Sequence, residues 1–377
     1  MTILKIITKV GGMCKSGGNG SLRFDAAFDI LRLSITIPRP MPRPPVEYAI
    51  VGGMREDFFI TPAGETHLRK IGGNALYAAV GARLWAEHVG IVSRVGENYP
   101  REWLETVEAR GIDARGVKIL PGPQDTRTFY AYLSLEERAD TDPAAHFARL
   151  GQPLPPELTD YKTSTEGQAD RKKFSPLAAR PSDLPQSYRL ARGCHLAPYD
   201  FVVHHTWPET MRRHGVRCIT CDPSIRYMQP AFADDVRQLV HGLDAFLPSE
   251  MEARAFFREP LDDLWLAAEA FGAMGAKIVV LKLGVHGQYL YDAEAKRKWH
   301  VPAYPVKVKD VTGAGDAYCG GFMTGLAQTH YPLEAALRGA VSASFVIEGV
   351  GAMYALDSSP ALVQARLHAL RDSVRPM

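Results

Sequence analysis

The chain has 377 residues, a length that suits one large α/β domain or two modest ones. Apolar residues make up 46% of it, and the formal net charge is only +2. This balance gives no general electrostatic footprint for nucleic acid, and no apolar run approaches the roughly eighteen residues of a membrane span. We therefore expect a globular protein with a sizeable core and no nucleic-acid or membrane partner.

Residues 1–45 differ in composition from the rest of the chain. Glycines cluster near the start, and prolines crowd the segment IPRPMPRPP. Because proline lacks a backbone donor and glycine costs backbone entropy, we expect a flexible N-terminal extension. A regulatory tail, a disordered extension and a start codon placed too far upstream all remain open. Lys5 and Lys9 interrupt the first apolar residues, and no cleavage pattern follows, so a secretory signal is not expected.

The chain holds an odd and sparse set of five cysteines. Such a set is typical of reduced thiols in a cytosolic protein, so we expect a cytoplasmic location. Cys218 and Cys221 form a CxxC within a predicted buried strand. Residues three apart on a strand point to opposite faces, which favours two structural thiols over a metal or redox site.

The predicted folded part opens at Tyr48, where YAIVGG has the pattern of a buried parallel strand that runs into a turn. Residues 57–72 then predict a hairpin whose turn contains Gly64. Further elements are predicted in order: a helix at 74–88, a strand at 90–96, a helix at 99–111 and a β-prone segment at 127–133.

Residues 134–187 interrupt this rhythm, because they are polar, proline-rich and without a clear period. A mobile surface loop and an inserted specificity element are both open interpretations. Alternation of strands and helices then resumes, with strands predicted at 193–199, 216–223, 245–250 and 276–284. This order predicts an α/β fold, a three-layer αβα doubly wound and mainly parallel sheet, which binds ligands beyond the carboxyl ends of its strands.

The clearest chemical motif is DVTGAGDAYCGGF, which begins at Asp310. Glycines at the start of a helix let an anion approach free N–H groups at the positive end of the helix dipole, so the motif predicts a phosphate cradle. Asp316 lies just inside this helix. From spacing alone it suits either a general base for a hydroxyl that attacks phosphorus or an acid that complements the dipole.

This motif resembles the C-terminal signature of the pfkB, or ribokinase-like, carbohydrate kinase family. GGNALYAAVGARLW, followed by GIVSRVGENYP, is similar to the family's N-terminal signature, and the resemblance covers nearly all of residues 46–356. It implies a large αβα domain, a small β-sheet lid, ATP and Mg²⁺ as cofactors, and often a stimulating K⁺.

The resemblance also implies roles for individual residues. Asp316 would be the catalytic base, with the N–H groups of Gly313, Ala314 and Gly315 as an anion hole. Substrate hydroxyls would meet Asp57, Gly72, Gly73, Asn74 and Tyr77. The nucleotide side would involve Lys282, Gly284, Gly287 and Thr312, and the metal side Glu252 and Asp310, with Asp310 and Thr312 near the monovalent cation.

The chain departs from the family pattern at three of these places. The family often has asparagine where this chain has Arg55 and Tyr77, so a ribose-like binding mode is not expected. Ser249 replaces the asparagine of an Asn-x-x-Glu motif that ends here at Glu252. Asp222, before a proline, is open between a role near the phosphates and a plain turn residue.

The predicted organisation is an extension at 1–45, a kinase domain at 46–358 and a C-terminal helix at 359–377. Lid pieces are expected near 57–72 and 116–133, and a homodimer is compatible with the resemblance. The predicted function is ATP-dependent phosphorylation of an alcohol group on a small polyhydroxylated substrate, a sugar or related polyol. The alternatives are a nucleoside kinase on the same fold and a catalytically silent binding protein.

Overall fold

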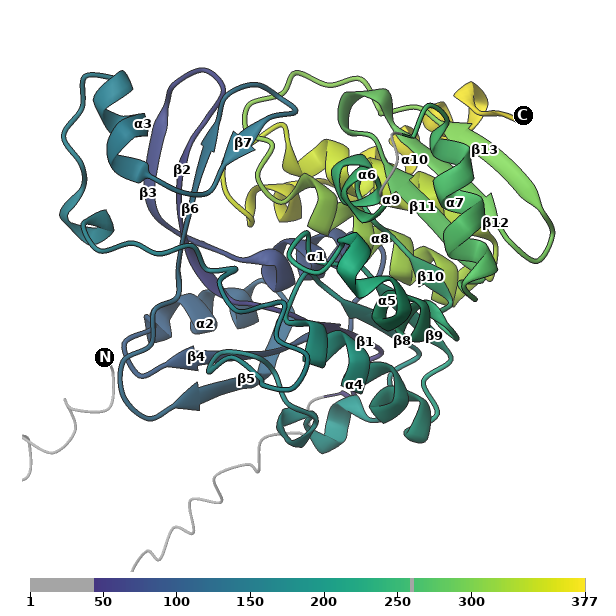
Figure 1. Cartoon of the computed structure of the whole chain (residues 1–377), viewed down its shortest axis with the longest axis horizontal. Helices are drawn as coiled ribbons and strands as arrows, with labels where there is room; N and C mark the ends of the chain where they lie inside the picture. Colours follow the sequence, from purple (N-terminus) through teal and green to yellow (C-terminus); the bar gives the residue numbers. More distant parts are fainter. Residues whose placement is uncertain (1–43, 258–260, 377) are drawn as a thin grey trace, which may run out of the picture. The chain divides into compact units, whose positions relative to one another are not determined.

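The structure, a computed structural model, describes residues 44–257 and 261–376. The extension predicted at 1–45 lies outside the described residues except for its last two. The strands form one ten-stranded sheet, in the order β14-β13-β12-β11-β10-β9-β8-β1-β4-β5, and one four-stranded sheet, in the order β3-β2-β6-β7 (Figure 1).

The large sheet consists of β1 (Tyr48–Val51), β4 (Val89–Gly96), β5 (Ile112–Leu120), β8 (Gly193–Leu196), β9 (Cys218–Cys221), β10 (Ala245–Phe246), β11 (Ile278–Lys282), β12 (Gln288–Asp292), β13 (Arg297–Val301) and β14 (Arg375–Pro376). The small sheet consists of β2 (Arg55–Ile60), β3 (Thr66–Gly72), β6 (Arg127–Tyr132) and β7 (Arg138–Ala139). The helices are α1 (Asn74–Arg83), α2 (Arg101–Ala109), α3 (Pro143–Arg149), α4 (Phe201–Arg213), α5 (Ala233–Val240), α6 (Glu250–Phe256), α7 (Leu264–Ala273), α8 (Ala314–Thr329), α9 (Pro332–Val346) and α10 (Pro360–Ser373).

The predicted doubly wound sheet is confirmed. The strands from β5 to β11 pair in parallel, whereas β12, β13 and β14 continue the sheet antiparallel. The chain leaves β1 towards β4 on one side and returns through β8 on the other. This reversal of strand order lies at β1, whose carboxyl end is followed by Gly52 and Gly53. In sheets of this kind, ligands bind beyond the strand ends at the point of reversal.

Both faces of the large sheet are covered by helices, as the continuous apolar character of the strands requires. Along β1, Tyr48 and Ile50 point into a core built with α1, α8, α9 and α10, while Ala49 and Val51 point into a core built with α4, α5 and α7. Cys218 and Cys221 on β9 lie in these two different cores, so the two thiols of the CxxC face opposite sides of the sheet.

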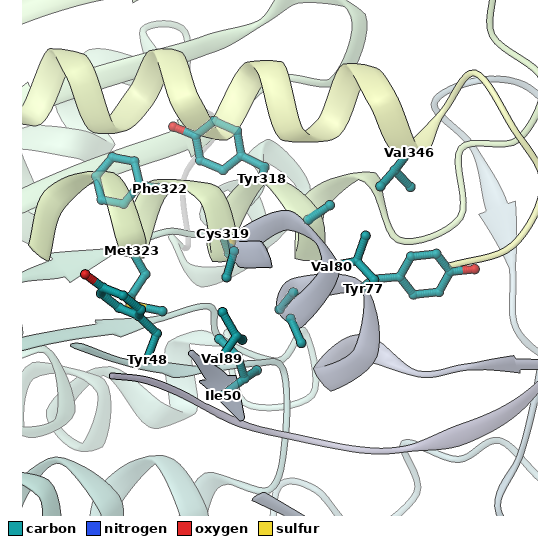
Figure 2. Close-up of a cluster of buried hydrophobic side chains, with 14 of the residues drawn as sticks. Tyr48, Ile50, Tyr77, Val80, Val89, Tyr318, Cys319, Phe322, Met323 and Val346 are labelled. Carbon is teal, nitrogen blue, oxygen red and sulfur yellow. The ribbon is translucent and has the colours of Figure 1, made fainter. Parts of the chain in front are cut away.

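Helices α1 and α8 approach each other closely because glycines line their contact. A Cβ atom on Gly320 would lie 1.8 Å from the carbonyl oxygen of Ala78, and one on Gly81 would lie 2.0 Å from that of Ala317. Figure 2 shows the buried cluster at this contact, with Tyr77 from α1 and residues of α8 around it. The contact therefore fixes where the N-terminal ends of both helices lie.

The small sheet has one apolar outer face, which the 134–187 segment covers. Phe58 and Ile60 of β2 pack with Phe129 of β6, and Phe147 of α3 and Leu158 complete this separate core. In Figure 1 the small sheet and α3 lie together, away from the large sheet. The 134–187 segment has no clear period in its sequence, yet it contains short helices. Its apolar side chains pack on the outer face of the small sheet.

The predicted lid boundaries need one correction. Residues 57–72 do form the hairpin β2–β3, but residues 116–120 belong to β5 at the edge of the large sheet. Only the later part of the predicted 116–133 piece, as β6, joins the small sheet. Movement of the small sheet as a lid stays a prediction.

In the described part of the chain, no helix has both the length and the apolar character needed to cross a membrane.

Replacing Gly320 with alanine tests the packing of α1 on α8. The added methyl group would collide with the Ala78 carbonyl, so we expect the free energy of unfolding to fall by about 1–3 kcal/mol in spite of alanine's better helix propensity. Denaturant titration measures this, with Gln364→Ala on the exposed side of α10 as a surface control. Unchanged stability in Gly320→Ala would show that the two helices are not in close contact.

Candidate active site

The N-terminus of α8 opens at the carboxyl edge of the large sheet. Gly313 precedes the helix in a left-handed conformation with φ of 75°. A Cβ atom there would lie 2.0 Å from the ring of Tyr77, so only glycine allows the turn to pack on α1. The sequence motif therefore forms the tight entry into a long helix that it predicted.

Free donors are present at this helix end, but not the three that were predicted. The N–H group of Ala314 donates to the carbonyl of Val311 at 3.2 Å, so it is used within the turn. In the described residues, no hydrogen bond occupies the N–H groups of Gly315 and Asp316. In the same residues, no hydrogen bond occupies the predicted Gly313 donor, so the donors available to the cradle are the N–H groups of Gly313, Gly315 and Asp316, with Ala314 as a turn residue.

A lysine lies beneath this cradle. Lys282, the last residue of β11, has its Nζ atom 3.7 Å from the position of a Cβ atom on Gly315. Its ammonium pairs with the Asp222 carboxylate and contacts the Cys319 sulfur at 3.6 Å. Burial alone would lower the pKa of Lys282, but Asp222 and its other neighbours raise it, so the lysine is charged at neutral pH.

Asp222 lies next to the cradle through its ion pair with Lys282, and a role near the phosphates stays a prediction. One of its oxygens pairs with Lys282, while the other, Oδ1, is buried without a hydrogen-bond partner. Burial raises the pKa of this carboxyl to about 7, and the Lys282 ammonium opposes that rise. The geometry favours the ionised pair, because the lysine contacts the carboxylate directly.

The predicted nucleotide-binding turn follows Lys282. Gly284 and Gly287 both have positive φ, 56° and 83°, and flank a single 3₁₀ turn. A Cβ atom on Gly287 would lie 2.2 Å from the carbonyl of Val301, whereas Gly284 faces open space. Gly287 thus has a structural reason to be glycine, and nucleotide contact at either residue stays a prediction.

Asp316 lies in the first turn of α8 and is half-buried. Burial raises the pKa of its carboxyl, while the charges of Lys282 and Arg138 lower it and Glu252 raises it further. A carboxylate whose pKa is raised accepts a proton more readily, which suits a general base.

Glu252 and Ser249 form a capping box at the start of α6. The Glu252 carboxylate accepts hydrogen bonds from the Ser249 N–H group at 2.8 Å and from its hydroxyl at 2.7 Å. Serine at the position where the family often has asparagine thus has a local structural role. Glu252 is close enough to influence the pKa values of both Asp222 and Asp316, so it lies near the phosphate region.

On the acceptor side, Asp57 of β2 is buried next to the paired glycines. Its Oδ2 atom accepts a hydrogen bond from the Gly73 N–H group at 3.3 Å, and Oδ1 has no partner. A Cβ atom on Gly72 would lie 1.8 Å from this carboxylate, so glycine is required there. Burial raises the pKa of Asp57 to about 7; the charges of Asp316 and Asp310 add to the rise, while the Gly73 bond and Arg55 oppose it.

Asn74 and Tyr77, two of the predicted substrate-binding residues, make structural contacts in this site. The Asn74 side chain accepts from the Gly53 N–H group at 2.8 Å and donates to the Pro198 carbonyl at 2.6 Å. These bonds tie together the loops after β1 and β8. Tyr77 is buried with its ring against Gly313, and its hydroxyl has no hydrogen-bond partner. Direct substrate contact by either residue stays a prediction. For Tyr77 we expect such a contact only through the hydroxyl, because the ring packs on Gly313.

Asp310 and Thr312 lie just before the cradle. The Thr312 N–H group donates to the Asp310 carboxylate at 2.9 Å, and the Thr312 hydroxyl is buried without a partner. Burial raises the pKa of Asp310. In the described part of the chain, no group of three or more histidine, cysteine or acidic side chains could hold a metal ion by itself.

The sequence analysis predicted a small sheet carrying Asp57, but it missed the side chains that β6 and β7 add beside Asp57. Asp57 pairs with Thr128, and Tyr132 pairs with Arg138, so these side chains share the inner face of the sheet. The Arg138 guanidinium lies 4.6 Å from the ring centre of Tyr130 and lowers the pKa of Asp316. Alternation along 127–132 was visible in the sequence, but not which strand pairs with it.

Comparison with known proteins agrees with this geometry. Residues 204–359 match the family model described as pfkB family carbohydrate kinase. The chain is 26% identical to a cytidine kinase of Thermococcus kodakarensis over 295 residues, which cover 78% of this chain and 92% of the relative. It is 25% identical to a 2-dehydro-3-deoxygluconokinase of Thermoproteus tenax, with 75% of this chain and 80% of the relative covered.

Solved structures show the same fold. A putative ribokinase II from E. coli, in complex with ATP and Mg²⁺, aligns with a TM-score of 0.63 at 17% identity, covering 86% of this chain and 99% of that one. A nucleoside kinase from Burkholderia thailandensis, in complex with inosine, aligns with a TM-score of 0.61 at 16% identity, covering 86% of this chain and 98% of that one.

The buried Asp57 carboxyl predicts a pH-dependent stability. Its pKa of about 7 in the folded protein, against an ordinary 3.8, means that the folded state holds a proton which the unfolded state loses above pH 4. This contribution is fully present below pH 4 and is lost as the pH rises to about 7. Asp57→Asn removes it, so the variant should gain stability relative to the wild type by up to roughly 4 kcal/mol between these pH values.

Denaturant unfolding of both proteins from pH 4 to pH 8 measures the difference. Other titrating groups are shared by the two proteins and cancel in the comparison. A difference that stays constant over this range would show that Asp57 is ionised throughout in the folded protein.

Proposed function

Since this chain belongs to the pfkB family and is a kinase with an alcohol group as acceptor, we propose that it transfers the γ-phosphoryl group of ATP to a hydroxyl of a small polyhydroxylated molecule. One observation carries this proposal. Asp57 is held by the Gly73 N–H group at the start of α1, and Asp316 lies in the first turn of α8, whose backbone packs against that of α1 at Gly81 and Gly320. An acceptor hydroxyl between them would face both a base and the phosphate cradle.

In this mechanism Asp57 holds the acceptor. Its Oδ1 atom has no donor among residues 44–257 and 261–376, so a substrate hydroxyl can donate to it. The Gly73 N–H bond fixes the carboxylate in place, which limits how the acceptor can turn. Asp57 thereby orients a second hydroxyl towards Asp316.

Asp316 takes the proton of the attacking hydroxyl as the hydroxyl oxygen bonds to the γ-phosphorus, while the bond from that phosphorus to the bridging oxygen of ATP breaks and ADP leaves. The free N–H groups of Gly315 and Asp316 lie at the positive end of α8, where they stabilise the charge on the transferring group. Lys282 adds a positive charge below the same turn. Phosphoryl transfer needs little else from a protein than alignment, charge stabilisation and exclusion of water.

The site fits ATP and Mg²⁺. The unoccupied N–H groups, the bare Gly315 surface and the buried Lys282 ammonium form a cradle for phosphate oxygens. Mg²⁺ usually keeps several waters and takes few protein ligands, which agrees with single acidic side chains here rather than a cluster. Glu252, Asp222 and Asp310 are the carboxylates available to it; when bound, the ion would neutralise phosphate charge. Activation by K⁺ near Asp310 and Thr312 stays part of the proposal.

A nucleoside is the second candidate acceptor. The cytidine kinase is similar to this chain over most of both lengths. The inner face of the small sheet carries the rings of Phe59, Tyr130 and Tyr132, which would stack on a base. A screen of sugars, polyols, sugar acids and nucleosides with ATP separates the two acceptor classes, and absence of Mg²⁺-dependent ATP binding would favour a silent binding protein.

Asp316→Asn tests the assignment of the base. The amide keeps the shape of the side chain but cannot take a proton, so kcat should fall by about 10²–10⁴ while ATP affinity stays nearly unchanged. Steady-state kinetics on the best acceptor and calorimetry with ATP measure the two quantities.

Glu102→Gln is the matched control, because Glu102 also occupies the first turn of a helix, α2. If Asp316 only complemented the helix dipole, both variants would lose about 0.3–1 kcal/mol of stability and keep normal turnover. Normal kcat in Asp316→Asn would therefore reject the catalytic role.

A further inference from the structure

Arg55 is a positive charge at the acceptor side of the site with no ionic partner. It begins β2 and alternates with Asp57, so both side chains belong to the inner face of the small sheet. A Cβ atom on Gly53 would lie 2.9 Å from its Nε atom, and one on Gly73 would lie 3.0 Å from its Cγ atom. The two glycines thus make room for the arginine to lie across the end of β1, next to the Tyr199 ring.

Three carboxylates are close enough to Arg55 for its charge to lower their pKa values, and each is hydrogen-bonded or ion-paired to another group. Asp125 pairs with Arg127, and Asp200 accepts hydrogen bonds from the N–H group and hydroxyl of Ser175. Asp57 accepts from Gly73 and has one free oxygen, yet it forms no hydrogen bond or ion pair with Arg55. Among the described residues, none lies within ion-pair or hydrogen-bond distance of the Arg55 guanidinium.

A half-buried guanidinium without a partner is costly, since it loses hydration and side-chain freedom without gaining a charge-assisted bond. A bound anion with two oxygens would recover that cost, because a guanidinium donates two parallel N–H groups to a carboxylate or phosphate. The neighbouring Oδ1 atom of Asp57 is instead a free hydrogen-bond acceptor, which a hydroxyl of the same molecule can fill by donating its proton.

We propose that the acceptor is a polyhydroxylated molecule with an anionic group, a carboxylate or a phosphate, which Arg55 binds while Asp57 binds a hydroxyl. This inference rests on the proposed kinase function and narrows its substrate class. The anionic group would lie beside Gly53 and Gly73, where the Arg55 side chain lies.

Matched pairs of acceptors test the proposal. D-Gluconate is compared with D-glucitol, and D-fructose 6-phosphate with D-fructose, so that the carboxylate and phosphate arms are separate; cytidine serves as the neutral nucleoside. Calorimetry gives Kd for each probe, and a coupled ATP assay gives its phosphorylation. The proteins are the wild type, Arg55→Gln, Arg55→Lys and Arg69→Gln.

Arg69→Gln is the matched control. It removes the same charge from the same small sheet, but Arg69 pairs with Glu56, which points to the opposite face from Arg55 and Asp57. Unfolding midpoints of all four proteins show whether a loss of binding reflects misfolding. Arg55→Lys keeps the charge without the two-pronged geometry, and should retain part of the binding.

The wild type should bind the anionic member of at least one pair more tightly than the neutral member. Arg55→Gln should weaken that anionic probe by about 10- to 100-fold, as loss of a charged hydrogen bond predicts, and change the neutral probe little. Arg69→Gln should match the wild type.

Three results would overturn the proposal: preference for the neutral member in both pairs, equal losses for neutral and anionic probes in Arg55→Gln, or no binding of either anionic probe. Phosphorylation of D-fructose or cytidine alone would support the kinase function and reject the proposed anion site. Arg55-dependent binding of an anionic probe that is never phosphorylated would instead reject the proposed reaction and keep the anion site.

Discussion

The site depends on the close contact between α1 and α8. Helix α1 begins directly after Gly73, whose N–H group holds Asp57, and α8 begins directly after Gly313 at the phosphate cradle. Gly81 and Gly320 let the two helices pack backbone against backbone, and the Tyr77 ring fills the space over Gly313. Since both helix ends are fixed by one interface, the distance between the acceptor carboxylate and the cradle is built into the core.

A second constraint is the accumulation of acidic groups at one edge of the sheet. Asp57, Asp222, Asp310 and Asp316 all have raised pKa values, chiefly because burial disfavours their charged forms, and the charge of Asp316 adds to the rise at Asp57 and Asp222. Such an arrangement is unfavourable for stability, and it is typical of sites that need proton acceptors and cation binding. Lys282 and the α8 dipole offset part of this charge on the nucleotide side, whereas Arg55 and Arg138 do so on the acceptor side.

The 134–187 segment shows how a region without an obvious period can have a defined place. Its apolar residues cover the outer face of the small sheet through Phe147 and Leu158. Asp140 pairs with Arg226 on the loop after β9, and Asp183 pairs with Arg94 of β4. The segment therefore connects the small sheet to the loop after β9 and to β4, and it packs on the outer face of that sheet.

The sequence alone determined the features that depend on local chain order. Alternating strands and helices predicted the doubly wound sheet, and the glycines around Asp316 predicted a helix entry beside an anion site, because turn geometry and helix dipoles act over a few residues. Strand β12 was not predicted, and β5 was taken for part of the small sheet, because strand pairing is a non-local choice. Only the tertiary structure decided that Asn74 bonds to two loops, that Ala314 is used within its own turn, and that Arg55 and Arg138 reach the acceptor side. These outcomes depend on which strands become neighbours and how closely two helices pack, and neither is encoded in the spacing of residues along the chain.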